Sequence, residues 1–84
     1  MSEGFPISIS LNYPVQAFGE EIAELKVQRR PTTKDLKAMD GEKGEVAKTA
    51  ALMARLCDVP PSTIDAMDAA DFSRAAEVVG GFLG

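Results

Sequence analysis

Residues 45–57, EVAKTAALMARLC, form the longest helical pattern in this 84-residue chain. Apolar side chains recur there every three or four residues, which places them on one face of an α-helix. The central stripe of that face comprises Val46, Ala50, Met53 and Cys57. Leu52 and Leu56 widen the stripe on one side, and alanines widen it on the other. We therefore expect this helix to lie at the centre of the core.

Further helical patterns flank this segment and are expected at residues 32–39, at residues 62–67, and from residue 68 or 69 onward. Thr32 and Asp35 have the spacing of a capping box at the start of the first. That short helix would offer Leu36 and Met39 to the core. Residues 59–61, Val-Pro-Pro, favour an extended turn before the later helices, because proline restricts the residue that precedes it.

The first third of the chain has a different period. Residues 7–11, ISISL, alternate apolar and polar side chains, which is typical of a half-buried strand. A second alternating run predicts a strand at residues 21–28. Ile22 is out of step with Leu25, which indicates a bulge or a late start of that strand. We expect an antiparallel hairpin whose strands are joined by a loop of about eight residues, closed by Gly19.

These patterns predict one α+β domain over residues 1–84. In it, an N-terminal two-stranded antiparallel hairpin packs against three to four C-terminal helices. The two ends, residues 1–6 and 81–84, are expected to fray. With a single cysteine, the chain has no intrachain disulfide to stabilise so small a core.

The last helix carries more apolar surface than one core face requires. Its stripe comprises Phe72, Ala75, Ala76, Val79 and Leu83. Val78 and Phe82 lie one turn apart on a neighbouring flank that this stripe does not use. Together with the extra width at Leu52 and Leu56, this flank predicts a surface for protein binding or self-association.

Residues that commonly carry catalysis or bind metals have structural interpretations here. The chain has no histidine. Cys57 lies on an apolar stripe, which favours a buried structural thiol over a nucleophile. The acidic series Asp58, Asp65, Asp68 and Asp71 lacks the spacing of a calcium loop, and helix caps and solvated surface account for it better. Arg29-Arg30 is interpreted as a solvated strand end. We therefore predict no enzyme activity, cofactor or metal.

Charge and hydropathy disfavour nucleic acids and membranes as partners of this chain. The net charge of −4, with 13 acidic and 9 basic side chains, disfavours nucleic-acid binding. The chain start has no signal-peptide pattern, and no run of about 20 apolar residues predicts a membrane span. We expect a cytoplasmic protein that binds other proteins.

The order of motifs resembles that of a known family. A strand of alternating acids and aliphatics ends in Arg29-Arg30-Pro31-Thr32, and a charged gap with glycines precedes the run ALMARL at residues 51–56. Residues 60–65, PPSTID, and Asp71-Phe72 follow, with a closing Phe-Leu pair. Over residues 7–83, the chain resembles the tail assembly chaperones of Mu-like and P2-like contractile-tailed phages and prophages.

This resemblance implies a non-enzymatic protein that is absent from the finished virion. It would bind the tape measure protein, keep it soluble and recruit tail tube subunits in the host cytoplasm. The small core and the surplus apolar flank separately lead us to expect a homo-oligomer. The family has no contact signature that transfers by position, so the site prediction depends on the helical faces alone. Two other classes stay open: a small regulatory module of the antitoxin or anti-repressor type, and an enzyme accessory subunit.

The resemblance also implies a second, longer product of the same gene. Such chaperones are often made in two lengths through a −1 ribosomal frameshift near the end of the shorter reading frame. Codons GGT TTT TTG for Gly81-Phe82-Leu83 would provide a sequence on which two tRNAs can re-pair. Gly84 would then be the last residue of the shorter product.

Overall fold

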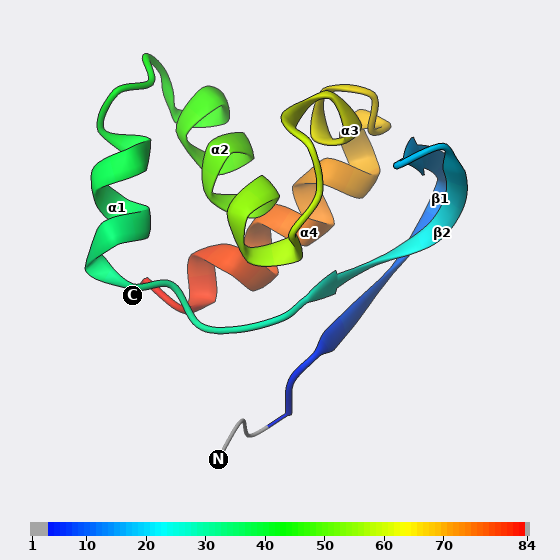
Figure 1. Ribbon diagram of the computed structural model, residues 1–84, viewed down its shortest axis with the longest axis horizontal. Coiled ribbons are helices and arrows are strands. Elements are labelled where there is room, and N and C mark those ends of the chain that lie inside the picture. Colours follow the sequence, from blue (N-terminus) through cyan, green and yellow to red (C-terminus); the bar gives the residue numbers. More distant parts are fainter. Residues whose placement is uncertain (1–3, 84) are drawn as a thin grey trace.

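The computed structural model describes residues 4–83 and shows an α+β fold, as the sequence predicts (Figure 1). A two-stranded hairpin comes first and helices follow it. The elements are β1 (Ile7–Ala17), β2 (Glu20–Val27), α1 (Thr33–Met39), α2 (Glu45–Cys57), α3 (Pro61–Asp65) and α4 (Ala69–Gly81). In Figure 1, α2 lies between α1 and α3, and the turn of the hairpin lies near α3.

The hairpin is longer than predicted, and the expectation of an eight-residue loop is wrong. The strands continue to Ala17 and Glu20, which pair directly, so only Phe18 and Gly19 form the turn. Residues 12–14, Asn-Tyr-Pro, look like a loop in the sequence but belong to β1. They lie in a bulge, because Ser10 pairs with Glu24 whereas Val15 pairs with Ile22. The irregularity expected near Ile22 therefore exists, and its extra residues are on β1.

Helix α2 is the centre of the core, as its pattern predicts. It contacts α1, α3, α4 and β2. Its buried side chains share one apolar cluster with those of both strands and of α4, and this cluster includes Ile9, Val15, Leu25, Val27, Leu52, Met53, Leu56, Ile64, Ala75 and Val79. At the end of β2, the Gln28 backbone N–H donates to the Leu56 carbonyl at 2.9 Å. The hairpin and α2 are thus joined by both apolar packing and a backbone hydrogen bond.

The predicted starts of α1, α2 and α4 are confirmed, and α3 begins one residue earlier than predicted. The Asp35 carboxylate accepts hydrogen bonds from the backbone N–H of Thr32 at 2.8 Å and from its hydroxyl at 3.2 Å. Asp68 caps α4 by accepting from the N–H groups of Ala70 and Asp71. Each cap satisfies backbone donors that have no partner inside the helix. Pro61 occupies the first turn of α3, where its missing N–H has no cost.

Two apolar side chains assigned to the core lie at the surface instead. Val46, in the first turn of α2, is 70% exposed and lines an open hollow with Ala50, Ile64 and Phe72. Leu36 on α1 is 44% exposed. The helical period identifies which face of a helix is apolar. It does not show how much of that face other elements cover.

The two ends are described only in part. Residues 1–3 and Gly84, which belong to the predicted frayed ends, lie outside the described residues. Gly81 is the last residue of α4, and the N–H groups of Phe82 and Leu83 donate to the carbonyls of Val79 and Gly80. Within residues 4–83, no helix has the length and apolar content that a bilayer crossing requires.

Candidate protein-binding surface

Leu52 and Leu56, predicted as part of an outward flank, are core residues. Their side chains are 1% and 0% exposed. The reason is that α2 is covered on several sides by α1, α3, α4 and β2, so its apolar arc is wider than one interface needs. The expectation that these two leucines lie at the surface is therefore wrong.

Val78 and Phe82 keep part of their surface accessible while packing against the core. The centroid of the Phe82 ring lies 5.6 Å from the centroid of the Phe5 ring and 5.5 Å from the guanidinium carbon of Arg30. Such aromatic and cation–π contacts join the N-terminal segment, the end of β2 and the end of α4. Of the four predicted site residues, the structure leaves only these two partly accessible.

The exposed large apolar side chains are mostly residues that the sequence did not single out for binding. Among residues 4–83 they are Tyr13, Phe18, Leu36, Val46 and Leu83. Phe18, at 75% exposed, is the most accessible of them. A signal for Phe18 existed, because Phe-Gly stands between two alternating runs where a tight turn favours Asn-Gly. This turn signal was missed because the loop was predicted to be about eight residues long.

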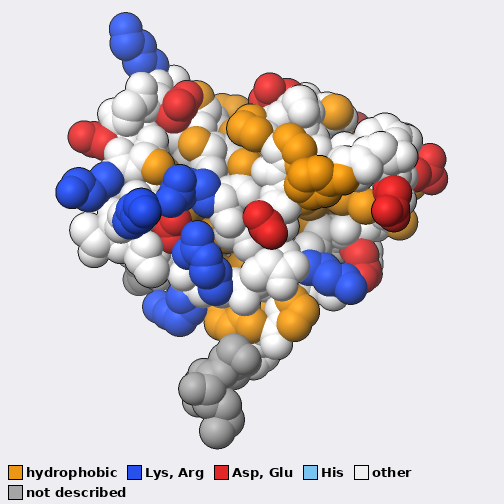
Figure 2. All heavy atoms as spheres, in the orientation of Figure 1, with side chains coloured by type: hydrophobic (Ala, Val, Ile, Leu, Met, Phe, Trp, Pro, Cys, Tyr) orange, Lys and Arg blue, Asp and Glu red, His pale blue; other side chains and the backbone are white. Residues whose placement is uncertain are grey.

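Basic side chains are concentrated around α1. Lys34 and Lys37 are on α1, and Arg29 and Arg55 lie beside it. Figure 2 shows Lys and Arg side chains gathered over the side where α1 lies. By contrast, residues 4–25 contain no Lys or Arg, and the hairpin turn is followed by Glu20 and Glu21. The net charge of −4 is therefore unevenly distributed.

Asp35 organises the basic side. Its buried carboxylate accepts from both terminal nitrogens of Arg29, at 2.6 and 3.1 Å, and from Arg55 Nε at 2.8 Å. The hydrogen bonds from Arg29 hold the pKa of Asp35 far below its usual value, against the opposing effect of burial. Reciprocally, Asp35 raises the pKa of Arg29. Arg29 is exposed just after the strand end, as the sequence predicts, but its ion pair with Asp35 also links the end of β2 to α1.

Asp71 has a similar role at the hairpin. Its buried carboxylate accepts from the backbone N–H groups of Asn12 at 3.1 Å and Tyr13 at 3.0 Å, and it pairs with Arg74. Burial would raise the pKa of Asp71, but these donors hold it below its usual value. The expectation that Asp71 is a cap or a solvated acid is wrong. It satisfies the unpaired N–H groups of the β1 bulge and joins that bulge to α4.

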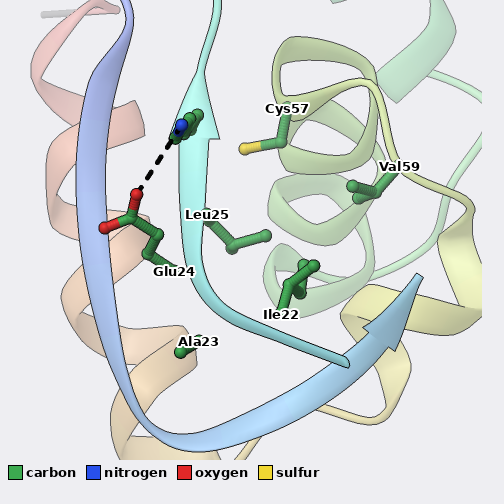
Figure 3. Close-up of a pocket in the computed structure, with 7 residues that line it drawn as sticks. Ile22, Ala23, Glu24, Leu25, Cys57 and Val59 are labelled. Carbon is green, nitrogen blue, oxygen red and sulfur yellow. Dashed lines mark ion pairs between the residues drawn. The ribbon is translucent and has the colours of Figure 1, made fainter. Parts of the chain in front are cut away.

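A shallow apolar hollow of about 360 Å³ lies between β2 and the end of α2. In Figure 3, Ile22 and Leu25 of β2 face Cys57 and Val59 across it. Burial raises the pKa of the Cys57 thiol to about 11, so this thiol is protonated at neutral pH. Its predicted burial is confirmed. Within residues 4–83, no cluster of three or more candidate metal-ligating side chains occurs.

These features define a small α+β domain with two buried carboxylates that link its elements and with scattered exposed apolar side chains. A family model described as "Phage tail assembly chaperone proteins, E, or 41 or 14" matches residues 8–84. Because this match spans nearly the whole chain, the chain belongs to the phage tail assembly chaperone family. A chaperone family indicates a non-enzymatic role with protein partners in the tail. No curated protein and no solved structure matches the chain.

Proposed function

We propose that this chain binds the tape measure protein of a Mu-like or P2-like contractile-tailed phage or prophage. It keeps that protein soluble in the host cytoplasm and recruits tail tube subunits to it. The observation that carries this proposal is the family match over residues 8–84. The tape measure protein is the client that the sequence resemblance implies.

The surface supports such a role. A long, helical client exposes apolar stripes that aggregate unless another surface covers them. The chain offers exposed apolar side chains on separate elements, at Phe18 in the hairpin turn and Leu36 on α1. Its net negative charge keeps the chaperone, and a complex containing it, soluble.

The flank of α4 is one proposed contact surface. Val78 and Phe82 are its accessible members, whereas Leu52 and Leu56 are buried in the same core cluster as Val79 of α4. Val78 and Phe82 are partly exposed, and the Phe82 ring lies against the Arg30 guanidinium. Aromatic and arginine side chains are enriched at protein interfaces. Self-association would use the same flank.

The function is tested by coexpressing the tape measure protein of the same phage or prophage with and without the chain. We expect the tape measure protein to be soluble only with the chain, and to co-purify with it. The tail tube protein, added as a third component, is expected to bind the pair more strongly than either member alone. A tape measure protein that stays equally insoluble with the chain would contradict the proposal.

The flank has its own prediction. Replacing Val78 and Phe82 together by serine should reduce tape measure capture by about tenfold, because apolar contacts at an interface centre are lost. Gel filtration reports whether self-association falls as well. Circular dichroism must show a folded variant, and Val46→Ser is the matched control for loss of surface apolarity. Unchanged capture by a folded double variant would place the contact elsewhere.

A further inference from the structure

The hairpin turn places a phenylalanine in an unfavourable backbone conformation. Phe18 has φ of +54° and Gly19 has φ of +79°. Positive φ at both central residues is the signature of a type I′ turn, for which Asn-Gly is strongly preferred. Glycine suits its position, but a bulky side chain rarely adopts the left-handed region. Phe18 thus opposes the local preference of its own turn.

Phe18 gains no packing inside the domain in return. Its side chain is 75% exposed, and it belongs neither to the core cluster nor to the partly buried side chains around it. The backbone beside it is nevertheless firmly held. The Thr63 hydroxyl donates to the Gln16 carbonyl at 2.8 Å. Earlier in β1, the backbone N–H groups of Asn12 and Tyr13 donate to the Asp71 carboxylate. A strained, exposed aromatic on a fixed support is characteristic of a binding anchor.

The charges around Phe18 indicate what it binds. Glu20 and Glu21 follow the turn directly, both exposed, and neither makes an ion pair among residues 4–83. Glu24, the next acid along β2, is paired with Lys26 at 3.8 Å. The turn therefore presents an exposed apolar ring, and the two residues that follow it carry exposed carboxylates without an ion pair among residues 4–83. A complementary surface has an apolar face bordered by Lys or Arg.

We propose that residues 18–21, the hairpin tip, dock on an apolar, helical segment of the client that carries Lys or Arg beside its apolar face. Phe18 enters the apolar face, and Glu20 and Glu21 pair with the flanking cations. This inference rests on the proposed function, since it supplies the partner chemistry for one contact of the chaperone.

The Phe18→Asn variant separates binding from folding. Asparagine favours the left-handed conformation, so F18N should unfold at a higher temperature than the wild-type chain. It should also bind the tape measure protein about tenfold more weakly, because the aromatic anchor is lost. Glu20→Gln with Glu21→Gln should weaken binding at low salt, and this difference should shrink at high salt. Val46→Asn removes a comparably exposed apolar side chain and should leave the affinity unchanged.

A photo-crosslinker identifies the occupant directly. Phe18 is replaced by benzoylphenylalanine in cells that produce the phage, and crosslinked peptides are mapped by mass spectrometry. The expected site is an apolar segment with Lys or Arg within one helical turn, in a crosslink that the two Glu→Gln changes reduce. Crosslinks to a second copy of this chain, to an acidic segment or to no protein would overturn the inference.

The outcomes also separate this inference from the proposed function. If the tape measure protein binds wild type and F18N equally, the hairpin tip is excluded and the proposed function stands. If position 18 crosslinks to a basic, apolar segment of a different tail protein, the hairpin tip is supported and the tape measure assignment fails.

Discussion

Leu56→Ala is expected to lower the free energy of unfolding by about 3 kcal/mol, within the range measured for buried leucines in other proteins. Leu56 is fully buried on α2, in the cluster that joins both strands to α4. The change removes apolar contacts and leaves a cavity that the surrounding helices fill only in part. For a domain of this size, whose total stability is on the order of 4–13 kcal/mol, the loss is large. Urea denaturation followed by circular dichroism measures it.

Leu36→Ala is the matched control, because it makes the same chemical change on a helix where the side chain is 44% exposed. Its expected cost is below about 1 kcal/mol. The comparison also tests the original assignment of Leu56 to a binding flank. If L56A were as stable as L36A yet failed to capture the tape measure protein, Leu56 would belong to an interface and not to the core.

The helices were predictable because their signals are local. The 3.6-residue period marks α2, and the caps at Thr32 and Asp68 mark the starts of α1 and α4. The fold class follows from these signals together with the alternation in β1. Periodicity and capping residues together assigned the helices correctly within a few residues.

The full length of β1 was not predictable, because its cause is distant in the chain. Asn12 and Tyr13 remain in the strand at a bulge whose N–H groups donate to Asp71, 59 and 58 residues away. A local pattern that includes Pro14 suggests a loop instead. The same limit applies to Asp71, which looks like an ordinary first-turn acid in the sequence.

The candidate binding surface was the least predictable feature. A helix with a wide apolar face can bury all of it when several elements of the same chain pack around it. Only the three-dimensional packing shows that Leu52 and Leu56 are buried in this way. Phe18 illustrates the converse. Its exposure follows from a two-residue turn, and that turn was hidden by the assumption that Asn12 ends the strand.

Asp35→Ala should cost about 2–3 kcal/mol, the second large effect expected. The change removes the acceptor for Arg29, Arg55 and the Thr32 N–H together. This loss of stability is at or below the low end of the range of about 3–5 kcal/mol that follows removal of one partner of a buried ion pair. Both arginine side chains are partly exposed, 45% and 38%, and can regain water once the carboxylate is gone. Thermal and urea denaturation at neutral pH measure this loss.

The Asp35→Asn variant tests whether Asp35 stabilises the fold through its negative charge or through its hydrogen-bonding shape. It also predicts how the stability difference from the wild-type chain changes with pH. The amide oxygen can still accept from Thr32, but the ion pairs are lost. Because the pKa of Asp35 is lowered in the folded chain, its charge stabilises the fold above the unfolded carboxyl pKa of about 3.9. That contribution decreases as pH falls below this value. The stability difference between wild type and D35N should therefore be constant from about pH 7 to 5 and shrink by about pH 2.5. Asp71 is the same in both proteins, so its own titration largely cancels. A difference that stayed unchanged down to the lowest pH would show that Asp35 acts through its hydrogen-bonding shape and not through its charge.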